Sequence, residues 1–210
     1  APFAQEQMHA GLNRSDNAPA TAWAEVEGAK AVLAEVDADT DTDPAKVALM
    51  FDYEADWMFA IQPQGRRIRY LSLCYAFYGA LRRRGLNVDI VFPGDDLAGY
   101  KLIAVPSQPI LDAETVARLD SSGAEILCGP RTGSRTADFA IPETLAPGPL
   151  HTALPIRVTH VESFPPDHTE PAGQFSLQTW REAVESSMEC YRAERYGEGV
   201  VWRKDRWTYV

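Results

Sequence analysis

Residues 47–51 of the chain read Val-Ala-Leu-Met-Phe, a short and continuous apolar run. Such a run is typical of a strand that is buried on both faces, as strands of a parallel sheet are. Three further apolar segments follow, at 88–92, 102–105 and 124–128. We therefore expect a domain that is built on at least four strands.

Helical patterns separate these strands. The first pattern ends in basic residues and Gly85, the usual signals of a helix C-terminus, and Asp112 precedes a second helix as its N-cap. Apolar residues recur at helical spacing in the first pattern: Ile68, Leu71, Tyr75, Tyr78 and Leu81. Strands that alternate with helices predict an α/β fold, here a three-layer parallel-sheet domain of flavodoxin-like or class I glutamine amidotransferase-like type.

The last third of the chain carries a weaker pattern. Seven prolines between Pro142 and Pro171 indicate long loops and short strands after Gly129. Residues 158–161 and 200–202 are apolar enough for two further strands, and we expect the second of them at an edge of the sheet.

The region before the first strand has a different organisation. Trp23, Val26 and Leu33 recur at helical spacing behind Thr21, which predicts an amphipathic helix over 21–36 with Thr21 as its N-cap. An acidic linker ending near Pro44 follows. Its Asp spacing resembles the start of a calcium-binding EF-hand loop. However, Thr42 stands where Gly is required, and Ala48 where a bidentate Glu is required. We therefore interpret residues 37–45 as a solvated boundary between a first segment, 1–36, and a second domain, 46–210.

Composition limits the classes of partner and compartment. The chain has 210 residues with a formal net charge of −10, which disfavours nucleic acid and anionic membranes as partners. Its three cysteines form neither a disulfide framework nor a CxxC zinc motif. No apolar run reaches transmembrane length, and the first residues lack the pattern of a signal peptide. We expect a cytoplasmic protein without metal or cofactor.

Cys128 is a candidate nucleophile, because it stands at the end of a predicted strand, where class I amidotransferases place theirs. The glycines that should precede it are absent, and no His-x-Glu pair follows to supply a base. A buried cysteine is favoured, and a free-standing amidotransferase-like hydrolase that uses Cys128 stays as the alternative.

Two loops carry further candidate chemistry. The loop 129–136 is rich in small residues, but it lacks the Lys and the glycine spacing of a phosphate-binding loop, so a structural turn or a subunit contact is favoured. Asp52, Glu54 and Asp56 directly follow the first strand, where they could hold a metal or act as acid and base. We favour a polar loop that covers the sheet.

Glu6 and His9 are three residues apart and could share one face toward a metal or a sugar hydroxyl.

Several stretches resemble glycoside hydrolase family 42 β-galactosidases in order and spacing. The sequence APFAQEQMHAGL (1–12) resembles the end of their catalytic barrel, and VALMFDYEADWMFAIQPQG (47–65) resembles the opening of their middle domain. The stretches 75–107 and 129–150 resemble the segments that follow, and the similarity becomes loose after residue 164. Residues 1–36 would then be the last part of a TIM barrel with its terminal helix, cut from a longer protein.

The resemblance implies a retaining β-galactosidase that acts through two barrel glutamates. These glutamates belong to earlier barrel strands, so no catalytic residue is expected in this chain. Glu6 and His9 match the family's Glu and His that hydrogen-bond the hydroxyls of galactose, which makes them the expected substrate-binding residues. The middle domain would be an amidotransferase-like fold without its nucleophile, and its family role is to hold three subunits together as a homotrimer.

A contact surface can be sought in the sequence itself. The segment after the first strand is more apolar than a solvated loop normally is. It contains Tyr53, Trp57, Met58, Phe59 and Ile61. Because a closed trimer uses two different patches on each subunit, we nominate 53–69 for one patch and the 129–139 loop for the other. The competing interpretation places these aromatic residues inside the domain's own core.

Overall fold

The computed structural model describes residues 11–14, 16–36, 44–189, 192–195 and 198–210. The chain divides into two compact units, Ala1–Asp43 and Pro44–Val210, and the division falls inside the linker predicted from the sequence. In the first unit, helix α1 spans Trp23–Leu33, as expected. Its N-cap is Ala22 rather than the predicted Thr21, and no side chain caps it. None of its residues is buried, so its apolar positions have no core to face among the described residues.

The second unit is built on a seven-stranded sheet with the order β2-β1-β3-β4-β11-β10-β9. The first five of these strands run parallel, and β10 and β9 are antiparallel to their neighbours, so the sheet is mixed. Their bounds, in that order, are Val88–Val91, Val47–Met50, Leu102–Val105, Glu125–Cys128, Trp207–Tyr209, Glu198–Lys204 and Arg192–Arg195.

The predicted central strand lies where the sequence pattern indicates. All four residues of β1 are buried, and β1 pairs with β2 on one side and β3 on the other. Such a strand has no polar face, which explains the continuous apolar run. The four predicted strands, 47–51, 88–92, 102–105 and 124–128, each match an observed strand to within one residue.

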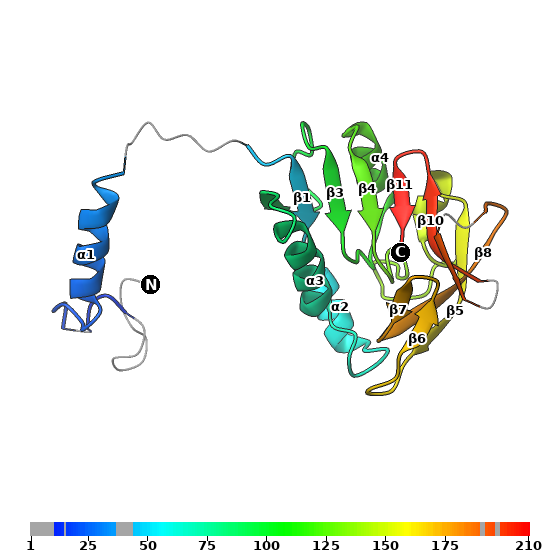
Figure 1. The fold of residues 1–210 in the computed structure, drawn as a ribbon, viewed down its shortest axis with the longest axis horizontal. Coiled ribbons are helices and arrows are strands. Elements are labelled where there is room, and N and C mark those ends of the chain that lie inside the picture. The colour runs from blue at the N-terminus through cyan, green and yellow to red at the C-terminus, as the bar shows by residue number, and fades with distance from the viewer. Residues whose placement is uncertain (1–10, 15, 37–43, 190–191, 196–197) are drawn as a thin grey trace. The chain divides into compact units, whose positions relative to one another are not determined.

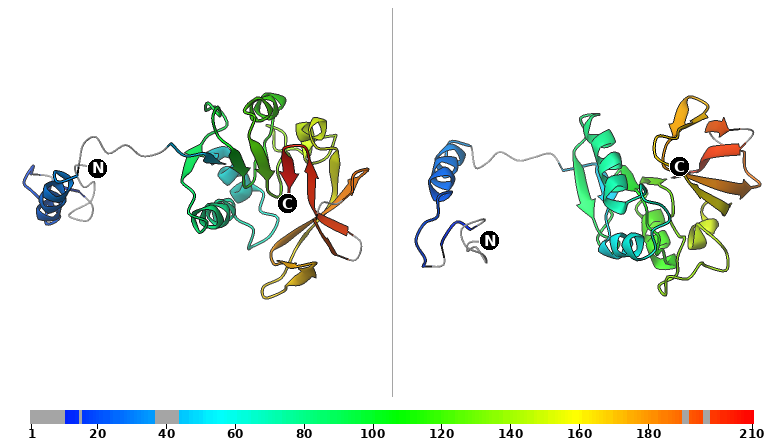
Figure 2. Two further views of the ribbon diagram at one scale, coloured as in Figure 1. Left: turned by 45° about the horizontal axis from the view of Figure 1, so that its top comes forward. Right: turned by 90° about the horizontal axis from the view of Figure 1, so that it is seen from below.

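Helices cover both faces of this sheet (Figures 1 and 2). On one face, α2 (Tyr53–Ile61) and α3 (Tyr70–Arg82) pack on Leu49 of β1. On the other face, α4 (Ala113–Ser121) and the 3-10 helix η1 (Gly148–Thr152) pack on Ala48 and Met50. Neighbouring residues of β1 thus point into two separate cores, which makes the domain the three-layer α/β fold that the sequence predicts.

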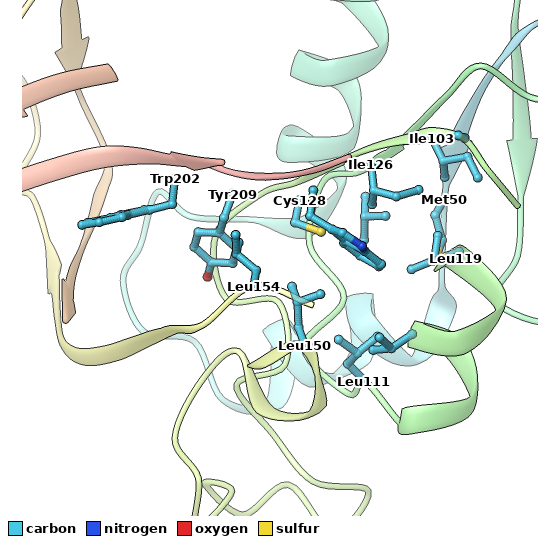
Figure 3. Close-up of a cluster of buried hydrophobic side chains, with 14 of the residues drawn as sticks. Met50, Ile103, Leu111, Leu119, Ile126, Cys128, Leu150, Leu154, Trp202 and Tyr209 are labelled. Carbon is cyan, nitrogen blue, oxygen red and sulfur yellow. The ribbon is translucent and has the colours of Figure 1, made fainter. Parts of the chain in front are cut away.

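The larger core lies on the face that α4 covers. Figure 3 shows Leu119 of α4 and Leu150 of η1 gathered with Ile126 and Cys128 of the sheet and with Tyr209 of the last strand. All five side chains are almost completely buried. At about 1.5–3 kcal/mol for each large apolar side chain, this layer is a major part of the folding free energy.

The last third of the domain differs most from the sequence-based prediction. Strand β10 lies between β11 and β9 rather than at an edge, and the last strand, β11, joins the sheet parallel to β4. Two small antiparallel sheets complete the domain. They pair β5 (Ile156–Ser163) with β8 (Trp180–Ser186), and β6 (Glu170–Ala172) with β7 (Phe175–Leu177). The prolines fall mainly in the loops between these strands, so the strands themselves are as long as eight residues.

Candidate self-association site

Helix α2 is apolar on two sides. Asp52 begins it, because its Oδ1 accepts a hydrogen bond from the backbone N–H of Glu54 at 2.9 Å. Ala55, Met58 and Phe59 of α2 are buried against the sheet. Its other large apolar side chains remain exposed at four-residue spacing, Tyr53 at 58%, Trp57 at 59% and Ile61 at 63%. Residues spaced by four lie on one side of a helix, so α2 presents an apolar stripe away from the core.

Helix α3 and the sheet edge extend this apolar exposure. Tyr70 and Cys74 of α3 are buried, whereas Leu71 and Tyr75 are 56% and 77% exposed. The helix predicted from the sequence is therefore present, but two of its five periodic apolar residues face outward. Ile90 of β2 and Phe92, which follows it, are also exposed. We call this set of exposed apolar residues the outer face: Tyr53, Trp57, Ile61, Leu71, Tyr75, Ile90 and Phe92.

Ring contacts hold one end of the outer face together. The rings of Tyr53 and Phe92 stack with centroids 6.3 Å apart, and Phe51 meets Tyr53 edge-on at 5.0 Å. Next to the face, a groove of about 630 Å³ runs between α2 and the start of α3. Its lining combines Leu71 with the charged side chains of Asp56, Arg66 and Arg69. An apolar surface beside arginines and a carboxylate has the composition of a protein–protein contact.

The prediction that the 129–139 loop forms the second contact patch is wrong for most of the loop. Arg131, Thr132, Gly133 and Arg135 are buried within the domain, so they are not available to another subunit. The guanidinium of Arg131 lies 4.2 Å from the centre of the Phe59 ring and donates to the backbone oxygen of Gln62 at 3.3 Å. This loop therefore holds α2 from the inside, and its fully exposed residues, Ala137 and Asp138, lie near its end.

The glycines of the same loop serve packing rather than phosphate binding. A Cβ on Gly129 would lie 2.1 Å from the carbonyl oxygen of Pro106, and one on Gly133, whose φ is +65°, would lie 2.0 Å from that of Pro147. The backbone N–H of Gly133 is used by the carbonyl of Gln108. The preferred prediction of a structural turn is confirmed, and no free row of amides remains here for an anion.

The carboxylates after β1 are structural. Besides capping α2, Asp52 accepts a hydrogen bond from Nε2 of Gln108 at 2.6 Å, and its backbone N–H donates to the Tyr70 hydroxyl at 2.6 Å. Glu54 and Asp56 lie on the first turn of the helix, where negative charge is favourable. Within the residues that the structure describes, no three His, Cys, Asp or Glu side chains come together as a metal would require.

Cys128 has the properties of a core residue. It is 1% exposed, and burial raises the pKa of its thiol to about 12. A nucleophilic cysteine needs a thiolate near neutral pH, which this environment opposes. The structure gives no support to the alternative of a hydrolase that uses Cys128.

Glu182 of β8 is a half-buried carboxylate that the sequence did not single out, and it links three segments of the domain. Oε1 of Glu182 accepts from the backbone N–H of Arg131 at 2.9 Å and from Nε1 of Trp180 at 3.0 Å, and Oε2 accepts from the Tyr209 hydroxyl at 2.6 Å. Burial raises the pKa of this carboxyl. Glu182 thereby ties β8, the 129–136 loop and β11 together. No spacing or motif marked it, because its partners are distant in the sequence.

Glu6 and His9, the predicted substrate-binding residues, lie outside the described residues.

None of the helices in the described part of the chain combines the length and the hydropathy that a membrane span requires.

Comparison with known proteins assigns the second unit of the chain to a family. Residues 45–204 match the family described as the β-galactosidase trimerisation domain. The chain belongs to this family. Its layered α/β fold is thus that of the non-catalytic trimerisation domain of glycoside hydrolase family 42.

Relatives and solved structures extend the similarity to the whole chain. The β-galactosidase BgaA of a Thermus species is 48% identical, and a β-galactosidase of Thermus thermophilus is 46% identical, each over 100% of this chain and 33% of the relative. The crystal structure of a β-galactosidase from the psychrophilic Marinomonas ef1 is 42% identical with a TM-score of 0.81, over 100% of this chain and 34% of that one. The chain therefore spans about a third of the length of these relatives.

Proposed function

We propose that this trimerisation domain joins three copies of a retaining β-galactosidase through the outer face. The observation that carries the proposal is that α2 has apolar residues on its exposed side as well as on its buried side. Its large apolar side chains Tyr53, Trp57 and Ile61 are about 60% exposed. Monomeric proteins rarely expose such a stripe, and aromatic residues are enriched at the centres of subunit contacts. In a cyclic trimer the face meets a different surface of the neighbouring copy.

Light scattering on the complete protein tests this proposal. At micromolar concentration, the expected mass is that of three protomers. A mass of one protomer would contradict self-association, and a mass of two would contradict the threefold symmetry.

We further propose that the complete protein hydrolyses terminal β-galactosides in the cytoplasm, without a cofactor, through glutamates outside this chain. The support is the identity of nearly half of all positions with two β-galactosidases of Thermus. The 210-residue chain alone is then inactive. Turnover of a chromogenic β-galactoside by the pure chain, after a control for the host's own enzyme, would contradict this assignment.

Glu6 and His9 are proposed to bind the hydroxyls of galactose in the complete enzyme. We expect Glu6→Ala to lower kcat/KM by roughly ten- to a thousandfold, because one or two charge-assisted hydrogen bonds of about 1.5–3 kcal/mol each are lost. Glu25→Ala is a matched control, since Glu25 is an exposed carboxylate on α1. Equal kinetics for the two variants would contradict the proposed role of Glu6.

A further inference from the structure

A second, smaller cavity lies away from the outer face. It has a volume of about 230 Å³ and lies where the loop after β4 meets β5 and β8. Arg131, Ser134 and Arg135 contribute polar groups to its lining, and Leu145, Val158 and Trp180 contribute apolar walls. A concave site with a few polar groups on an apolar wall has the general character of a small-molecule site.

The charges around this cavity do not balance. Arg131 is 1% exposed and Arg135 is 9% exposed. Among the residues that the structure describes, no carboxylate forms an ion pair with either guanidinium. Glu182 also lines the cavity, but its two oxygens are engaged by a backbone N–H, an indole N–H and a hydroxyl. Two buried cations beside one half-buried carboxylate leave an excess of one positive charge, which is costly unless an anion compensates it.

The hydrogen-bond donors show the same excess. Arg135 donates from Nε to Oε1 of Gln62 at 2.6 Å and from Nη1 to the backbone oxygen of Ser134 at 2.7 Å, whereas its Nη2 has no acceptor in the described part of the chain. Nε and Nη1 of Arg131 and the hydroxyl of Ser134 are buried without a partner in the described part of the chain, whereas Nη2 of Arg135 is not among these buried atoms. Buried donors are normally satisfied, so a cluster of free donors around one cavity indicates a bound acceptor.

We propose that this cavity binds a small monocarboxylate with a compact apolar body, whose carboxylate accepts a hydrogen bond from Nη2 of Arg135. A single negative charge balances the excess, whereas a dianion such as phosphate would face Glu182 across the same small space. The apolar body would contact Leu145, Val158 and Trp180. Arginine suits this role because its guanidinium stays charged and its donors match a carboxylate.

Calorimetry on the complete protein with benzoate as the probe tests the site. Benzamide is the neutral probe of the same shape, and we expect it to bind at least roughly tenfold more weakly than benzoate, because it lacks the charge. Equal affinities for the two probes, or no heat with benzoate at millimolar concentration, would overturn the proposal.

Two variants locate the site. Arg135→Gln should weaken benzoate binding by roughly tenfold or more, while Arg157→Gln, which removes an exposed arginine on β5 away from this cavity, should change it by less than about twofold. Should Arg135→Gln fail to fold, Val161→Trp serves instead. Val161 is 38% exposed on β5 and lines the cavity, so a bulkier side chain there should obstruct benzoate without disturbing the core. Unchanged binding in these variants would overturn the proposal.

The source of the carboxylate is tested by the mass of the assembly. If the ligand is a free small molecule, saturating benzoate leaves the mass by light scattering unchanged. If benzoate dissociates the assembly, the natural occupant is a carboxylate of a neighbouring copy, and the small-molecule assignment is wrong. Because this mass is compared with and without benzoate, the result is distinct from the test of trimerisation itself.

Discussion

The two helical layers of this domain pack on the same sheet but differ on their outer sides. The outward side of α4 carries Glu114, Ala117 and Asp120, all of them polar or small. The outward side of α2 and α3 carries Trp57, Tyr75 and the other residues of the outer face. Both layers bury apolar residues on their inner sides. Folding of a single copy therefore accounts for every apolar position of α4, but it does not account for the exposed apolar residues of α2. The difference supports the proposal that the α2–α3 layer is the side that meets a partner.

The internal supports of the two layers also differ. The α4 layer is held by apolar packing around Leu119 and Leu150, and the hydrogen bond between Arg206 and the Asp120 carboxylate of α4 is exposed. Helix α2 is held in addition by polar contacts from distant loops, since Asp52 is bonded to Gln108 and the Arg131 guanidinium lies over Phe59. Buried polar contacts of this kind fix the position of a helix more specifically than apolar packing alone. That precision suits a helix whose outer side is proposed to contact another subunit.

The largest effect on stability is expected in the α4 layer. Leu119→Ala should lower the free energy of unfolding by about 2–5 kcal/mol, because it leaves a cavity beside Ile126 in the larger core. The mass of the assembly should not change under native conditions, since Leu119 is 1% exposed. Denaturant unfolding together with light scattering measures both quantities. If Leu119→Ala dissociated the assembly without lowering the free energy of unfolding, the assignment of α4 to the core and of the α2–α3 layer to the subunit contact would be contradicted.

Smaller effects are expected from the residues that cap the two helices, Asp112 at α4 and Asp52 at α2. Oδ1 of Asp112 accepts from the backbone N–H of Thr115 at 2.7 Å, as predicted from the sequence, and Asp112→Ala should cost about 1 kcal/mol. Asp52→Ala should cost more, because it also removes the acceptor of Gln108. Only the Asp52 variant should weaken self-association, since α2 contributes to the outer face and α4 does not. Equal effects of both variants on association would contradict this.

The Asp112 cap also predicts a dependence on pH. Hydrogen bonds from Thr115 lower the pKa of this carboxyl in the folded protein. Its stabilisation is therefore fully present above the pKa of the unfolded chain and is lost as the pH falls through the folded value. In Asp112→Ala this part of the acid dependence should be absent.

The smallest effect is expected at Cys128. Because the thiol is buried and its pKa is raised to about 12, iodoacetamide should label it at least roughly a hundredfold more slowly in the native protein than after unfolding. Mass spectrometry of the labelled peptide measures this ratio. Rapid labelling of the native thiol at neutral pH would restore the discarded interpretation of Cys128 as a nucleophile.

The parallel half of the fold was predictable because its signals are local. The apolar run 47–51, the basic end of α3 before Gly85 and the cap at Asp112 each specify one element through nearby residues. Strand β11, Trp207–Tyr209, was missed because it has only three residues and, besides its hairpin with β10, is held by pairing with β4, about 80 positions earlier in the chain. Short strands that are stabilised by distant partners leave no periodic pattern.

The candidate site was predictable in part for the same reason. The aromatic density of 53–61 indicated a contact surface, and the exposure of Trp57 agrees with it, while Met58 and Phe59 of the same run are buried. The sequence could not show that Arg131 is buried, because its partners Phe59 and Gln62 are about 70 residues away. Arginine is usually exposed, so the 129–139 loop was assigned to the surface.

The most direct test of the account is the mass of two matched variants of the complete protein by light scattering. Trp57→Asp places a charge on the outer side of α2, and Ala117→Asp places the same charge on the outer side of α4. We expect the mass of the Trp57→Asp variant to fall from three protomers to one at micromolar concentration, because a buried unpaired charge at a contact costs about 2–4 kcal/mol or more. Ala117→Asp should keep the mass of three. A trimer that survives Trp57→Asp, or one that is lost in Ala117→Asp, would contradict the assignment of the outer face.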